Sequence, residues 1–184
     1  MKKVLLIVMV CFFGLGLFSQ EEIARYQTMK SVMKISAFKD GENFQWENKN
    51  ISAVLDYRTG EFTVRLRNSD FRENKTEATI LPDSIQQELE YMFKGMFPIR
   101  EIINQKSMHQ SYVVELQLTN WELYIDNTIN FDLTVTNPGT NQANYRMFQL
   151  HGKMYNYELN LPAFNDFDNV IEVWISFNAR SIQR

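Results

Sequence analysis

The sequence predicts a single all-β domain, an antiparallel barrel or sandwich of about eight strands with one short α-helix. From Ser31 onward, apolar and polar residues alternate in short runs that turn residues separate, a pattern typical of half-buried strands. The composition agrees, because 14 Phe, 8 Tyr and 3 Trp accompany only 7 Gly and 4 Pro, and aromatic residues favour sheets. No internal repeat or low-complexity segment divides the chain, so we expect one domain.

The N-terminal segment, residues 1–20, has the layout of a secretory signal peptide. Lys2 and Lys3 precede an apolar run from Val4 to Phe13, and small and polar residues follow. This run is too short for a transmembrane helix, which needs about 20 apolar residues. We therefore expect a periplasmic or secreted protein, with no transmembrane segment in its mature domain of residues 21–184.

The clearest predicted hairpin spans residues 51–67. Two alternating runs, Ile51–Tyr57 and Glu61–Arg67, flank the turn Arg58-Thr59-Gly60, which predicts two strands with one wet face. An earlier pair of strands, Met29–Phe38 and Asn43–Trp46, is expected around a turn at Asp40-Gly41.

Five more strands are predicted downstream, over Tyr112–Thr119, Ile129–Thr136, Tyr145–Met154, Tyr155–Leu161 and Val170–Phe177. In the last of them Trp174 falls on the face opposite Ile175 and Phe177. The tetrapeptide Asn137-Pro138-Gly139-Thr140 ends the second.

One stretch departs from the two-residue period. Ile85, Leu89, Met92 and Phe93 fall on one helical stripe, and Gly95 follows where a helix C-terminus favours glycine. This spacing predicts a helix over about 83–94, whose apolar face would cover one mouth of a barrel or the side of a sheet.

Charge excludes two classes of partner. Removing Lys2 and Lys3 with the signal peptide changes the net charge from -3 to -5, and the remaining basic residues are dispersed. We therefore expect no binding to nucleic acid or to anionic membrane surfaces. The single cysteine, Cys11, would leave with the signal peptide, so the mature domain would depend on its hydrophobic core for stability.

No motif for catalysis or metal binding stands out. The two histidines, His109 and His151, lie on separate segments without a third donor. The pair Asp166 and Asp168 flanks Phe167, but neighbouring acids do not establish the spacing that glycoside cleavage requires. We expect a turn at this pair, no metal, no cofactor, and a protein that is not an enzyme.

The interior of the predicted barrel can be filled or hollow. A barrel of about eight strands either packs its bulky inward side chains together or leaves room for one ligand. The alternation pattern is the same in both cases, so both readings remain open at this stage.

The order of segments resembles that of the YceI-like family of secreted and periplasmic proteins. The stretch Ile51–Phe71, with Asp56 before its turn, looks like the family's strand pair that closes on a Ser-x-Phe-like end. Phe97-Pro98 takes the place of a Tyr-Pro that follows the family's helix. Leu118-Thr119 matches half of a Leu-Thr-x-His-Gly motif, whose last two positions are Trp121 and Glu122 here.

This resemblance implies an antiparallel lipocalin-like barrel that holds a lipid or polyisoprenoid chain in an apolar tunnel, with no catalytic residues. The implied wall contains Phe62, Val64, Leu66, Leu116, Leu118, Phe131, Leu133, Tyr157 and Phe177. An apolar tunnel is sufficient for such a ligand, because burying each methylene gains about 0.8 kcal/mol.

Two other functions remain open. A filled barrel or sandwich could act as a protein-interaction module at the cell surface, with Trp46, Trp121 or Trp174 in an outer aromatic patch. A hydrolase that uses the Asp166–Asp168 carboxylates is the third possibility.

Overall fold

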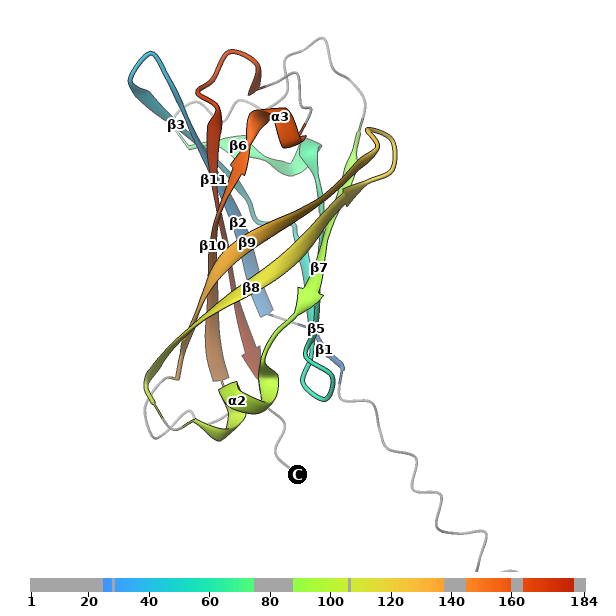
Figure 1. The fold of residues 1–184 in the computed structure, drawn as a ribbon, viewed down its shortest axis with the longest axis vertical. Coiled ribbons are helices and arrows are strands. Elements are labelled where there is room, and N and C mark those ends of the chain that lie inside the picture. The colour runs from blue at the N-terminus through green and yellow to red at the C-terminus, as the bar shows by residue number, and fades with distance from the viewer. Residues whose placement is uncertain are drawn as a thin grey trace, which may run out of the picture.

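The computed structural model describes residues 25–27, 29–74, 88–105, 107–137, 145–159 and 164–180, whose strands form one antiparallel sheet curled on itself (Figure 1). The strands are β1 (Arg25–Gln27), β2 (Met29–Lys39), β3 (Glu42–Asn48), β4 (Ser52–Asp56), β5 (Glu61–Arg67), β6 (Arg72–Glu73), β7 (Glu90–Met96), β8 (His109–Asn120), β9 (Ile125–Thr136), β10 (Tyr145–Tyr155) and β11 (Val170–Arg180). The helical elements in these ranges are η1 (Asn68–Asp70), α2 (Ile99–Asn104) and α3 (Asn156–Leu159).

Several of these strands are parts of longer ones. β1 and β2 follow one path across the sheet, which we call a pass, and β3 and β4 form a second pass. The pairs Gln27↔Val54 and Met33↔Asn48 show this, because both fit the register of a single antiparallel hairpin. β5 and β6 form a third pass, which η1 interrupts, since β5 pairs with β4 and β6 pairs with β3.

These three passes and the strands β7 to β11 make eight, in chain order around the sheet. The ring closes where β11 pairs with β2, for example at Ile171↔Ala37. The prediction of an antiparallel barrel of about eight strands is therefore confirmed.

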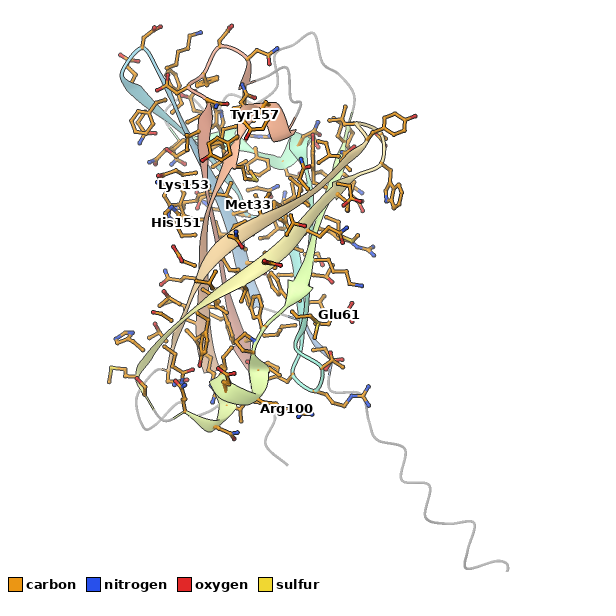
Figure 2. All side chains as sticks on the ribbon, in the orientation of Figure 1. Met33, Glu61, Arg100, His151, Lys153 and Tyr157 are labelled. Carbon is orange, nitrogen blue, oxygen red and sulfur yellow. The ribbon has the colours of Figure 1, made fainter. Side chains whose placement is uncertain are left out.

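Alternation also places side chains as predicted. In β8, Val114, Leu116 and Leu118 are buried, whereas Glu115 and Gln117 are exposed. Figure 2 shows the same division, with Met33 inside the barrel and His151 and Lys153 projecting from its outer surface.

The predicted turns are present as well. Asp40 and Gly41 have φ values of 52° and 80°, and Gly60 has a φ of 84°. Only glycine fits at position 60, because the Phe97 carbonyl oxygen occupies the space that a Cβ atom would need there.

The prediction of a helix over about 83–94 is wrong from residue 90 onward, and residues 75–87 lie outside the described part of the chain. Glu90–Met96 is strand β7, which pairs with β5 and β8. Leu89, Tyr91 and Phe93 also alternate, and the structure buries this set. The helix at one end of the barrel is α2, which buries Ile99 and Ile102 (Figure 1).

The strand predicted over Tyr155–Leu161 is also wrong. β10 ends at Tyr155 and α3 follows, while residues 160 and 161 are outside the described ranges. The Asn156 N–H donates to the Asn169 carbonyl at 2.9 Å, and its side-chain amide donates to the Phe164 carbonyl. These bonds hold the chain in a turn at the end of β10.

Aromatic rings fill the barrel next to α2. Phe62 stacks on Phe97 and Phe177 with centroid distances of 4.5 and 5.0 Å, and Phe148 stacks on Phe177 at 4.9 Å. A second cluster joins Phe44, Trp46, Phe164 and Phe167 with edge-to-face distances of 5.4 to 5.8 Å.

The predicted signal peptide, residues 1–20, is outside the described ranges. Within those ranges, no helix has the length and hydrophobicity to cross a bilayer.

Candidate ligand-binding site

The barrel wall opens between β9 and β10. Their pairing runs from Met147↔Thr136 to Gly152↔Phe131, although β9 already begins at Ile125. Within the described residues, Ile125–Asn130 pair with β8 alone. The two strands therefore diverge beyond Gly152, and we call the opening between them the slot.

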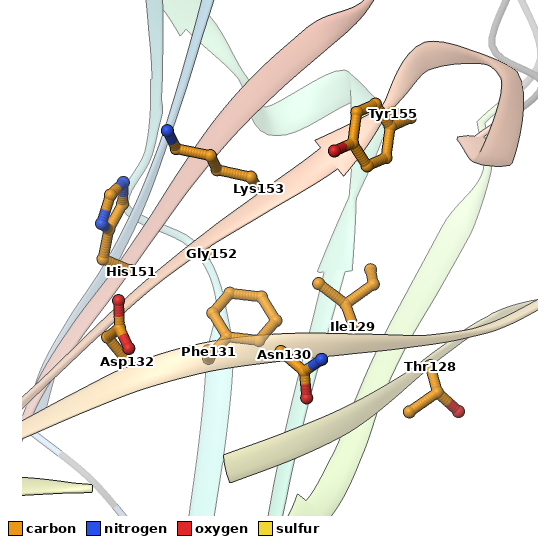
Figure 3. Close-up of a pocket in the computed structure, with 9 residues that line it drawn as sticks. All are labelled: Thr128, Ile129, Asn130, Phe131, Asp132, His151, Gly152, Lys153 and Tyr155. Atoms are coloured by element: carbon orange, nitrogen blue, oxygen red, sulfur yellow. The ribbon is translucent and has the colours of Figure 1, made fainter. Parts of the chain in front are cut away.

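The slot is a cavity of about 340 Å³. Its floor is apolar, since Ile129 and Phe131 project from β9 toward β10 and are only 4% and 0% exposed (Figure 3). The full lining is Thr128, Ile129, Asn130, Phe131, Asp132, His151, Gly152, Lys153 and Tyr155. The volume of the slot lies in the range of small-molecule sites, and its lining is more polar than apolar.

Gly152 sets the position of the floor. A Cβ atom at this residue would lie 2.6 Å from two carbons of the Phe131 ring, so the ring can rest against the β10 backbone only because position 152 is glycine. The ring also meets Phe93 edge-to-face with a centroid distance of 5.9 Å. Phe131 is thus fixed between the slot and the barrel interior.

Two charged or titratable side chains of the rim, Lys153 and His151, lie near Glu172 of β11, which is outside the slot lining. Lys153 Nζ lies 3.6 Å from Glu172 Oε1, and His151 Nε2 lies 3.9 Å from Glu172 Oε2. The His151 ring stacks on Trp174 with a centroid distance of 4.9 Å. Asp132 pairs across the ladder with His151 and points toward it in Figure 3.

The residues predicted to form the tunnel wall are mostly placed together. Eight of them are at most 6% exposed: Phe62, Val64, Leu66, Leu116, Leu118, Phe131, Leu133 and Phe177. Tyr157 is misplaced in that prediction, because it belongs to α3 and is 70% exposed. It stacks on Tyr155 at the surface with a centroid distance of 5.5 Å.

Phe131 is the one predicted wall residue that also lines the slot. Phe62 and Phe177 belong to the stack near α2, where rings occupy the interior. Contact between the predicted wall and a ligand stays a prediction.

Sequence reasoning did not identify the slot. Its signal is Gly152, a glycine inside an otherwise strand-like run, which marks a close approach of another group to the backbone. The rim residues Asp132 and Lys153 carry no local signal, because outward charged residues occur along most of the strands.

The other candidate sites separate in the structure. His109 Nδ1 lies 3.2 Å from Thr136 Oγ1 at the end of the β8–β9 ladder, whereas His151 pairs with Asp132 in the β9–β10 ladder. Within the described ranges, no three His, Cys, Asp or Glu side chains lie close enough together to hold a metal ion. Asp166 is exposed and forms an ion pair with Lys39 at 3.6 Å. The Asp168 N–H donates to the Phe38 carbonyl at 2.7 Å, as expected for a turn.

The aromatic patch of the interaction-module hypothesis does not form from the three tryptophans. Trp46 is 6% exposed and packs inside the barrel, whereas Trp121 is 86% exposed at the β8–β9 turn. Trp174 lies on the outer face of β11 beneath His151.

Solved structures share this fold. The chain is similar to a polyisoprenoid binding domain from Saccharophagus degradans implicated in plant cell wall breakdown, with a TM-score of 0.63 and 10% identity over 88% of this chain and 100% of that one. It is also similar to BcnA from Burkholderia cenocepacia, with a TM-score of 0.53 and 11% identity over 81% of this chain and 96% of that one. No family model matches the sequence, and no curated protein resembles it in sequence. At these identities the likeness concerns the fold, and it confirms the barrel that the resemblance to the YceI-like family implied.

Proposed function

We propose that this protein binds an apolar molecule, a lipid or polyisoprenoid chain, and carries it without chemical change. The observation that supports the proposal is the slot, where the wall of a lipocalin-like barrel opens onto the buried side chains of Ile129 and Phe131. The likeness to a solved polyisoprenoid binding domain points in the same direction.

The energy available from such a site is sufficient. Burying about ten methylenes gains about 8 kcal/mol, which corresponds to a micromolar dissociation constant before ordering costs are counted. We propose the slot as the place for the chain, because stacked rings occupy the barrel interior next to α2.

Uptake of a fluorescent polyene such as retinol tests the proposal directly. The wild-type protein should enhance its emission saturably, and native mass spectrometry after mild extraction should show a co-purifying lipid. Ile129→Trp should reduce uptake because the indole occupies the floor of the slot. Met96→Trp is the matched control, since Met96 is 58% exposed on β7 and is not among the residues that line the slot.

The proposal includes export through the signal peptide expected at residues 1–20. Expression of the full chain in a bacterial host should give a periplasmic product shortened by about 20 residues. A product that stays in the cytoplasm at full length would contradict this part of the proposal.

A second candidate is a ligand-free barrel that binds another protein. The β8–β9 turn favours it, because Trp121 and Tyr124 are 86% and 94% exposed there, and exposed aromatic residues are common anchors of interfaces. Absence of polyene uptake, together with a partner captured by the wild type and lost in Trp121→Ser, would support this function over lipid binding.

A further inference from the structure

We propose that the slot selects amphiphiles whose polar end is an uncharged hydroxyl over the same chains carrying phosphate or diphosphate. This inference rests on the proposed function and specifies the ligand class. The inference is argued from the charged side chains at the rim of the slot, because these would contact the polar end of the ligand.

The rim offers little positive charge to an anion. Lys153 is the only lysine or arginine among the nine lining residues, and it already contacts Glu172 at 3.6 Å. A phosphate monoester carries about -1.5 to -2 charges at pH 7, and protein sites for such groups use arginine forks, several lysines or backbone nests. With Asp132 and Glu172 against Lys153, the formal charge around the slot is negative when His151 is neutral.

Asp132 favours a hydroxyl for a second reason. Among the described residues no ion pair involves its carboxylate, which is exposed on the outer face of β9 and lines the slot. An ionised carboxylate only accepts hydrogen bonds, so it can bind the O–H of an alcohol but repels a phosphate. Hydrogen bonds to charged groups are the stronger class.

The apolar part of the ligand has a matching place. Ile129 and Phe131 form the floor directly inside the rim, and Phe131 is one residue from Asp132 on β9. An alcohol at the rim would therefore have its chain over the floor and its hydroxyl beside Asp132. The same pose would bring a phosphate against the Asp132 carboxylate.

A competition assay tests this selection. Geranylgeraniol, geranylgeranyl phosphate and geranylgeranyl diphosphate have the same hydrocarbon chain. Each is titrated against retinol bound to the protein without its expected signal peptide. We expect the alcohol to compete at least about tenfold better than either phosphate. In Asp132→Asn the preference for the alcohol over the phosphates should decrease several-fold, because the substitution removes the charge of the side chain and keeps its shape.

Two further variants sharpen the test. Asp126→Asn is the control, since Asp126 lies on the same face of β9 outside the slot lining, and it should keep the wild-type preference. Glu172→Gln should improve competition by the phosphates, because it releases Lys153 and His151 from their shared carboxylate.

The outcomes separate this inference from the function on which it rests. If a phosphate competes as well as the alcohol, or if Asp132→Asn keeps the full preference, the inference is wrong and lipid binding stands. If none of the three compounds competes and retinol itself does not bind, both the proposed function and the inference fail.

Discussion

Replacing Gly152 with alanine tests the packing that shapes the slot. Gly152 does not have a positive φ, so alanine fits its backbone, and in an ordinary strand this exchange would stabilise by about 0.5–1 kcal/mol. Here the new Cβ would lie 2.6 Å from the Phe131 ring. Since carbon atoms pack at about 3.5–4.0 Å, the ring must move by about 1 Å.

The movement has a cost because Phe131 is fully buried and contacts Phe93. Overpacking of this kind destabilises by about 1–3 kcal/mol, which for a domain of this size lowers Tm by about 3–10 °C. Thermal unfolding followed by circular dichroism measures the change. The displaced ring should also weaken retinol binding, since Phe131 forms the floor of the slot.

A double-mutant cycle assigns the effect to this contact. Phe131→Leu removes the ring edge, so adding Gly152→Ala to it should cost much less than in the wild type, with a coupling energy of about 1 kcal/mol or more. A Gly152→Ala protein that is as stable as the wild type, or more stable, would refute the reasoning.

Three other predictions concern stability. Phe177→Ala should lower the free energy of unfolding in urea by about 3–5 kcal/mol, because the Phe177 ring is buried in the stack near α2. The control Trp121→Ala, at an 86% exposed site, should change stability by less than about 0.5 kcal/mol. Equal effects of the two substitutions would contradict the described core. Asn120→Ala should cost about 1–3 kcal/mol, because the Asn120 amide donates to the Glu90 carbonyl at 3.1 Å, and a neutral result would mean that this bond is replaced. Burial, with a smaller contribution from the charge of Glu122, raises the pKa of Tyr91 above its ordinary value of 10.0. The folded state then holds the phenol proton more tightly than the unfolded state, so stability should fall as pH rises above about 10, and unfolding at pH 8 and pH 11 should show a smaller loss in Tyr91→Phe than in the wild type.

The local alternation in the sequence was sufficient for most strands, because each has one wet face. The wrong helix illustrates where this fails: Leu89 and Phe93 fit a helical stripe and a strand equally well, and pairing with β5 and β8 decides between them. Tyr155 and Tyr157 show the reverse, since their alternation falls on a surface turn.

The slot could not be predicted from the sequence for a different reason. It exists because the β9–β10 ladder stops at Gly152↔Phe131, and the end of a ladder depends on two strands that are distant in the chain. The floor residue Ile129 begins the strand predicted over Ile129–Thr136, but the sequence does not show that this residue has no pairing partner on β10.

Closure of the ring by β2 and β11 also affects how the chain folds during synthesis. β2 and β11 lie far apart in the sequence, so one edge of β2 has no partner until β11 has been synthesised. Products truncated before Val170 would expose that edge, with Met33 and Ile35 beside it, and unpaired edges of this kind promote aggregation. Such fragments should therefore require a chaperone to remain in solution, whereas pairing of β11 with β2 removes this edge.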